Sequence, residues 1–153
     1  MSIEDLQRVI DGSLDGASPL ARRIYVNDRW SATAVQRFIN EIRAATVATV
    51  RSDGRPHASV VLAACMDGTM YFTASIGSLL LRNLRRQPAV AITIADREHD
   101  VTIHGQAVPL GKASDLAELV SELHSLSRRG QFIPRDWDGY MYAVRIGRIF
   151  LSG

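Results

Sequence analysis

The sequence predicts a mainly β protein, a six-stranded antiparallel barrel with peripheral helices. Six short segments are rich in β-branched and apolar residues, and tight turns that contain glycine join several of them. The strands do not alternate with long helices as they do in a parallel α/β sheet. Closing these strands into a barrel removes the unpaired edges that an open sheet would expose, so we expect a closed barrel.

The N-terminal region has a weaker pattern than the rest of the chain. The 153 residues, 46% apolar and 22% charged, have the size and composition of one globular domain. Residues 3–10 can form a short helix, but the run DGSLDGASP at 11–19 is rich in turn residues. We expect an N-terminal arm or linker over residues 1–32 and a barrel domain over residues 33–153.

The barrel domain is expected to open with an amphipathic helix and a three-stranded meander. Thr33 and Gln36 have the spacing of a capping box, and apolar residues at 35, 38, 39 and 42 fall on one helical face. Three strand signals follow, at residues 45–51, 57–65 and 70–75. They are separated by the turns SDGRP, in which Gly54 can take a positive φ, and MDGT.

The second half continues with a short helix, two strands, a helix and a last strand. Leucines at helical spacing followed by Pro88 predict a helix over residues 78–86. Strands are expected at 89–95, at 100–110 with a bulge at Gly105, and at 140–151. Between the last two, a leucine-lined helix is expected to open at Ser114 or Asp115.

Composition narrows the range of partners. The net charge is +2, and the arginine pairs are scattered along the chain instead of clustered with aromatics, which argues against a nucleic-acid module. No apolar run approaches the roughly 20 residues of a membrane helix, and the N-terminus is acidic where a secretory signal is basic. A single cysteine, Cys65, is consistent with a reducing compartment. We therefore expect a cytoplasmic protein without nucleic-acid or membrane partners.

The stretch SIGSLLLRNLRRQP, residues 75–88, is the most informative for function. A strand that passes through a glycine turn into a helix offers free backbone N–H groups and the positive end of the helix dipole to an anion. The hydroxyl groups of Thr73, Ser75 and Ser78 would add donors. The alternative interpretation is that Ser78 only caps the helix and the other two are ordinary strand residues.

The ordered set ATVATVRSDGRPHASVV, DGTMYFTAS, RNLRRQPAVAITI and VTIHGQAVPL resembles the flavin-binding split β-barrel family. That family includes the pyridoxamine 5'-phosphate oxidases and the flavin- or deazaflavin-dependent reductases. The resemblance implies a homodimer with a cofactor groove between subunits, holding FMN or the deazaflavin coenzyme F-420. It further implies that the cofactor ring lies along the second and third strands and that the phosphate end sits at the turn before the short helix.

The resemblance also implies a set of cofactor-binding residues. It gives Ser59 and the backbone of Val60 and Val61 for the ring, with His99 and Asp100 approaching from the neighbouring subunit. For the phosphate end it gives Thr73, Ala74, Ser75 and Ser78, with Arg82 one helical turn further on. We assign no catalytic residue, because the cofactor would carry the hydride.

The chain departs from the family where a phosphate would need cations. Leu79 and Leu80 stand where the oxidases have Arg or Lys after the turn serine, and Ser59 and Ala64 replace an arginine and a lysine on the second strand. Arg82 is the candidate replacement, and its loss should weaken cofactor binding by about 1 to 3 kcal/mol. Ser59 and the arginine-rich composition, which is typical of GC-rich codon usage, favour the deazaflavin. The missing lysine weakens the case for either cofactor.

Other chemistry-bearing residues give weaker signals. His57, His99 and His104 lack the spacing of a metal site, so we expect no metal, and Cys65 is read as a packed residue and not a nucleophile. Trp30, Trp137 and Tyr140 could close a pocket or anchor a dimer, and the loop at 128–140 is a candidate for substrate selection.

Two functional hypotheses remain. The first is a homodimeric oxidoreductase that uses FMN or F-420 for hydride transfer with a small organic substrate. The second is a non-catalytic split-barrel dimer whose degenerate groove binds an apolar ligand or none, with Leu79 and Leu80 forming an apolar wall.

Overall fold

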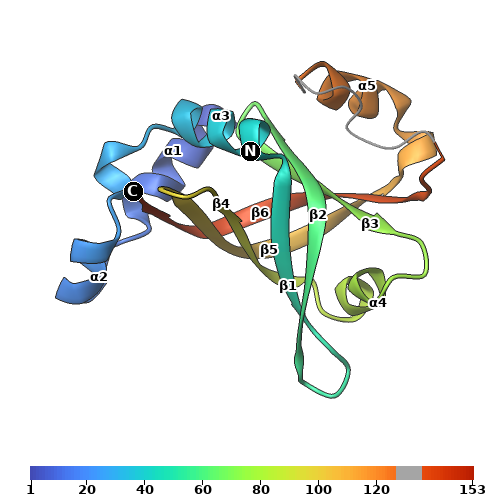
Figure 1. The fold of residues 1–153 in the computed structure, drawn as a ribbon, viewed down its shortest axis with the longest axis horizontal. Helices are drawn as coiled ribbons and strands as arrows, with labels where there is room; N and C mark the ends of the chain where they lie inside the picture. Colours follow the sequence, from blue (N-terminus) through green and yellow to red (C-terminus); the bar gives the residue numbers. More distant parts are fainter. Residues whose placement is uncertain (127–135) are drawn as a thin grey trace.

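The computed structural model describes residues 1–126 and 136–153, and its six strands form a closed antiparallel barrel (Figure 1). The barrel order is β1-β2-β3-β6-β5-β4. The strands are β1 Ala44–Val50, β2 Pro56–Met66, β3 Thr69–Ser75, β4 Ala89–Ala95, β5 Asp100–Lys112 and β6 Gly139–Ser152. This confirms the predicted fold class, and each strand end lies within two residues of the predicted one.

Seven helical segments accompany the barrel in the described ranges. They are α1 Ile3–Gly12, α2 Pro19–Ile24, η1 Asn27–Arg29, α3 Ala32–Ile42, α4 Leu79–Arg86, η2 Ala113–Asp115 and α5 Ala117–Ser125. Helices α1 and α3 pack together at one end of the barrel, whereas α4 follows β3 on another side (Figure 1). None of the helices described is long and apolar enough to cross a membrane.

The four predicted helices are present as α1, α3, α4 and α5, whereas α2, η1 and η2 were not predicted. Two of the predicted N-terminal caps are wrong. Helix α3 begins after Ser31, whose hydroxyl accepts the N–H of Ala34, so the predicted capping box of Thr33 and Gln36 is wrong. The Gln36 side chain instead accepts the N–H of Gly68 at 3.0 Å and ties α3 to the β2–β3 turn. Ser114 and Asp115 likewise lie in η2, ahead of α5.

The core fills the barrel and extends onto the helices at its end. Large fully buried side chains come from the strands, among them Phe72, Ile92, Ile103 and Ile149, and from α1 and α3, namely Leu6, Ile10 and Ile39. Helix α1 therefore contributes to the same core as the barrel. The division into an arm and a barrel domain at residue 33 stays a prediction.

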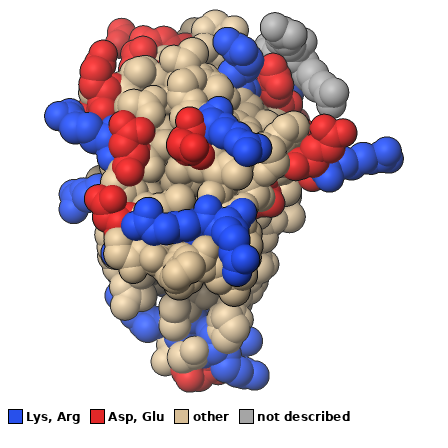
Figure 2. All heavy atoms as spheres, turned by 90° about the vertical axis from the view of Figure 1, so that its left-hand side faces the viewer, with Lys and Arg blue, Asp and Glu red and all other residues tan. Residues whose placement is uncertain are grey.

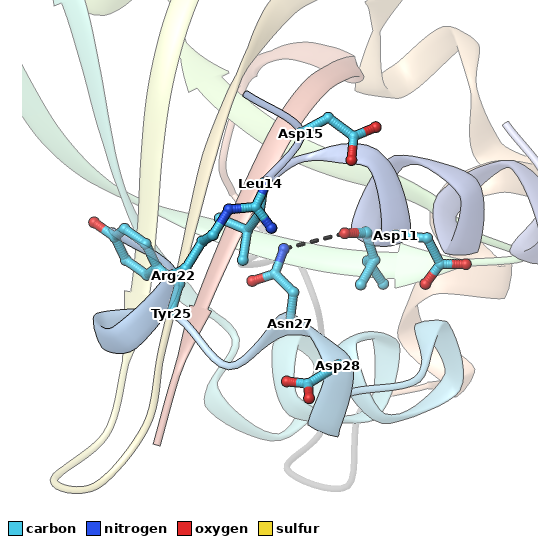
Figure 3. A pocket seen from close by; sticks show the side chains of 8 residues that line it. Asp11, Leu14, Asp15, Arg22, Tyr25, Asn27 and Asp28 are labelled. Atoms are coloured by element: carbon cyan, nitrogen blue, oxygen red, sulfur yellow. Dashed lines mark hydrogen bonds between the residues drawn. The ribbon is translucent and has the colours of Figure 1, made fainter. Parts of the chain in front are cut away.

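A buried amide links the N-terminal segment to the last strand. Asn27, 5% exposed, donates through Nδ2 to the carbonyls of Ile10 (3.1 Å) and Ile149 (2.9 Å). Its Oδ1 accepts the N–H of Leu151 at 3.0 Å. In Figure 3 the Asn27 side chain points from η1 toward α1, and the dashed line marks its bond to the carbonyl of Ile10. This one side chain thus fixes α1 and η1 against β6.

The predicted bulge at Gly105 is present and has a steric cause. The β5–β6 register shifts between His104 and Gly105. A Cβ at position 105 would lie 2.3 Å from the carbonyl oxygen of Arg145, so only glycine fits so close to the neighbouring backbone.

Candidate functional site

The site begins where the barrel splits between β2 and β3. The β2–β3 pairing starts at Ala63↔Phe72 and runs to the turn, whereas β1 pairs with β2 from Leu62 to Pro56. Residues 56–62 of β2 therefore have a strand partner on one side only in the described structure. The other side is an open backbone edge.

The direction of the backbone groups on this edge follows from strand alternation. The N–H of Ala63 donates to the carbonyl of Arg43, on the β1 side. Because N–H and C=O groups alternate sides along a strand, those of Val60 and Leu62 point toward the open edge and those of Val61 toward β1. Of the two backbones expected at the ring, Val60 is thus the one directed into the split, and its side chain is 74% exposed.

A groove of about 320 Å³ occupies this split. Six of the predicted site residues line it, namely Ser59, Val60, Val61, Thr73, Ser75 and Ser78. Three further residues complete the lining, namely Leu62, Leu80 and Trp137. The sequence pattern brought out the polar members, but it could not place Leu62 in the site, and it left Trp137 undecided between pocket and dimer contact.

The turn between β3 and α4 presents hydrogen-bond donors to the groove. The N–H of Ser78 donates to the carbonyl of Ser75, and Gly77 has φ +76°, a conformation that favours glycine. Ser78 caps α4 by accepting the N–H of Leu81 at 3.1 Å, as the alternative interpretation expected. The N–H groups of Leu79 and Leu80 donate to none of the described residues, so the first turn of α4 keeps two free donors.

The serine hydroxyls of the groove are held by neighbouring side chains. His57 Nε2 and Ser59 Oγ are 2.8 Å apart on β2, and Trp137 Nε1 donates to Ser75 Oγ at 2.8 Å. Thr73, 7% exposed, lies on β3 and also lines the groove. The groove wall is therefore neutral and rich in hydroxyl and N–H groups.

No arginine or lysine lines the groove in the described part of the chain. Leu80 is 3% exposed and belongs to the barrel core while it also lines the groove. Arg82 is exposed on α4 and its side chain makes no hydrogen bond or ion pair with any described residue. The interpretation of Arg82 as a substitute for the missing cations stays a prediction.

Three other predicted site residues lie away from the groove of their own chain. Ala74 is 1% exposed and faces the core. His99 lies in the β4–β5 turn, where its ring contacts those of Trp30 (5.8 Å) and Phe38 (6.2 Å). Asp100 accepts a hydrogen bond from the Ser152 hydroxyl. The contribution of His99 and Asp100 to a partner's groove stays a prediction.

The remaining reactive residues do not form a second catalytic centre among the residues described. Burial raises the pKa of the Cys65 thiol to about 12, so the thiol is protonated at neutral pH, as expected for a packed cysteine. The His104 ring packs against Phe150, and His104 does not line the groove. No three His, Cys, Asp or Glu side chains of the described ranges come together as metal ligands would.

A second, larger cavity lies beside the N-terminal helices. It measures about 380 Å³ and is lined by Asp11, Asp15, Asp28, Arg22 and Tyr25 together with apolar residues (Figure 3). It lacks the open strand edge of the groove and the hydroxyl groups of Ser59, Thr73, Ser75 and Ser78. On the face that carries this end of the molecule, basic and acidic side chains are interspersed (Figure 2). We therefore place the candidate site in the β2–β3 groove.

Comparison with known proteins shows the family of the chain. The family profile described as pyridoxamine 5'-phosphate oxidase matches residues 31–135. A pyridoxine/pyridoxamine 5'-phosphate oxidase of Pseudoalteromonas atlantica is 33% identical over 99 residues, which are 63% of this chain and 46% of that protein. The match thus spans somewhat less than half the length of that relative.

Solved structures share the fold at low sequence identity. A conserved hypothetical protein of Mycobacterium tuberculosis superposes with a TM-score of 0.66 at 20% identity, over 84% of this chain and 86% of that chain. An F-420 reductase superposes with a TM-score of 0.57, also at 20% identity, over 74% of this chain and 94% of that chain.

Proposed function

Because the chain belongs to the pyridoxamine 5'-phosphate oxidase family, we propose that it is an oxidoreductase that binds a flavin or deazaflavin in the β2–β3 groove. The observation that carries the proposal is the open edge of β2 beside a row of hydroxyl and N–H donors. A small organic substrate would exchange a hydride with the bound ring, which is the chemistry that such a cofactor supplies.

The residues present fit the two ends of such a cofactor. The ring system has a polar edge with hydrogen-bonding groups, and the free N–H and C=O groups of Val60 and Leu62 would meet it. The phosphate end requires donors, and the free N–H groups of Leu79 and Leu80 lie beside the hydroxyls of Ser75 and Ser78. Neutral donors make weaker bonds to phosphate than charged ones, so we expect moderate affinity.

In this proposal the residues of the chain bind the cofactor and orient it. Apolar walls from Leu62 and Leu80 would exclude water from the ring of a bound cofactor, and the His57–Ser59 pair would present a hydroxyl to it at the β2 side. We assign no catalytic residue to the groove, because the bound cofactor would carry the hydride.

Cofactor titration tests the proposal. Purified protein is examined for visible absorbance and then titrated with FMN and with F-420. We expect binding of at least one at tens of micromolar or below. If the protein carries no chromophore and binds neither, the oxidoreductase proposal fails.

A second candidate function has its own support. No cation lines the groove in the described structure, and Val60, Leu62 and Leu80 give it an apolar side. These observations favour a non-catalytic dimer that binds an apolar ligand or none. Binding of an apolar dye that neither FMN nor F-420 displaces would support this second function.

A further inference from the structure

Trp137 has a contact in the groove that the proposed function leaves unexplained. It lies just before β6, and its indole Nε1 donates to the Oγ of Ser75 at 2.8 Å. The two residues are 62 positions apart in the chain, so the contact depends on the pairing of β3 with β6. Both residues line the groove.

The position of the indole is set by the same strand pair. Ser75 is opposite Gly139 in the β3–β6 register, and the N–H of Ile76 donates to the carbonyl of Asp138. A Cβ at position 139 would lie 2.4 Å from the Trp137 ring and 2.4 Å from the carbonyl oxygen of Ala74. Glycine at 139 therefore leaves the space in which the ring lies against β3.

The chemistry of indole makes this hydrogen bond directional. An indole N–H can donate but cannot accept, so Ser75 Oγ is the acceptor and the Ser75 hydroxyl hydrogen must point elsewhere. The Ser78 Oγ is likewise an acceptor, because it accepts the N–H of Leu81. The hydroxyls at both ends of the turn before α4 are thus left with a hydrogen to donate.

We propose that Trp137 is a positioning and specificity residue that fixes Ser75 as a hydrogen-bond donor and so makes the groove prefer a phosphate-bearing cofactor over the same ring without phosphate. This inference rests on the proposed function, because it concerns the end of the cofactor at the β3–α4 turn. Acceptor oxygens of a phosphate gain from a hydroxyl already directed at them, whereas a phosphate-free ring has nothing to place there.

The test compares FMN with riboflavin, which lacks only the phosphate, in Trp137→Phe and the wild type. Phenylalanine keeps an aromatic wall and removes the N–H. We expect FMN to bind roughly three- to tenfold more weakly to this variant, and riboflavin to bind within about twofold of the wild type. Tyr25→Phe is the control, because Tyr25 contacts Phe150 and does not line the groove.

Ser75→Ala gives a second, independent test of the role of Trp137. It should weaken FMN binding at least as much as Trp137→Phe does, and the double variant should bind FMN no more weakly than Ser75→Ala alone, because Trp137 acts through Ser75. If the wild type binds F-420 and not FMN, the same comparison uses F-420 and its chromophore without the phosphate-linked tail.

The outcomes separate this inference from the proposed function. Equal weakening of FMN and riboflavin, or no weakening of either, overturns the role of Trp137 while the cofactor site stands. Additive effects of the two substitutions overturn the route through Ser75. Wild-type protein that binds none of the four compounds overturns the proposed function, and the role of Trp137 with it.

Discussion

Cys65, at the end of β2, is 1% exposed, and its thiol is 3.5 Å from the side-chain oxygen of Gln36. Burial raises its pKa from 9.0 to about 12. We therefore expect the native thiol to react with a disulfide reagent at pH 8 far more slowly than the same thiol in guanidinium chloride. Labelling of the folded protein as fast as that of the denatured protein would contradict the buried position.

The same thiol has a consequence for stability at high pH. The pKa of the Cys65 thiol is higher in the folded protein than in the unfolded chain, so the unfolded chain loses this proton first as the pH rises. The contribution of the thiol to the free energy of unfolding is therefore fully present below about pH 9 and is lost as the pH rises toward 12. Burial also raises the pKa of Tyr142, so the comparison must isolate the thiol. Urea midpoints of the wild type and Cys65→Ala should converge as the pH is raised from 8 to 10.5. Parallel midpoints would contradict the shift.

Arg82 is the exposed cation nearest in sequence to the donors of the β3–α4 turn. Its guanidinium makes no bond to a described residue, so it is available to a phosphate. We expect Arg82→Ala to weaken binding of whichever cofactor the wild type takes by about 1 to 3 kcal/mol, and the loss to shrink in high salt. Arg23→Ala, on exposed α2, is the control. Unchanged affinity in Arg82→Ala would remove Arg82 from the site.

At the scale of elements, the buried Asn27 amide joins α1 and η1 to β6, together with the Ser13 hydroxyl, which accepts the N–H of Ile149, and the backbone bond from Val26 to Leu151. Asn27→Ala would leave the carbonyls of Ile10 and Ile149 and the N–H of Leu151 without their partner. We expect the free energy of unfolding to fall by about 2 to 4 kcal/mol, measured by urea denaturation. Asp28→Ala, at the exposed neighbouring position, should change it by less than about 0.5 kcal/mol. Equal stabilities of the two variants would show that the amide does not tie these elements together.

The strands and four of the helices were predictable from local signals, because periodicity and turn residues are local properties, whereas the short helical segments α2, η1 and η2 carried no sustained apolar period. The helix caps were less predictable. Ser31, Thr33 and Ser114 all satisfy the composition of a cap, and only tertiary contacts decide among them: Gln36 is taken by the β2–β3 turn, and η2 displaces the start of α5. Likewise the Thr73, Ser75 and Ser78 hydroxyls could be proposed from sequence, whereas Trp137 could not be assigned to the groove, because its contact with Ser75 requires the β3–β6 register.

At the scale of the whole molecule, the open face of the groove is the feature that a single subunit leaves unfinished. The groove volume of about 320 Å³ lies near the lower limit of small-molecule sites, and Val60 at its edge is 74% exposed. His99 and Asp100, expected to approach a cofactor from a neighbouring subunit, do not line the groove of their own chain. We propose that a second copy of the chain covers the groove, with its His99 and Asp100 beside the cofactor.

Val60→Asp tests this arrangement. The substitution places a charge on the exposed surface of β2 without entering the core, so we expect a folded protein that changes from a dimer to a monomer of about 16.9 kDa by light scattering. Leu20→Asp on α2, where the side chain is 58% exposed, is the matched control and should remain a dimer. Val60 also lines the groove, so the oligomeric mass and not cofactor binding is the readout for this variant. A wild-type monomer that binds FMN or F-420 with full affinity would show that one chain completes the site by itself.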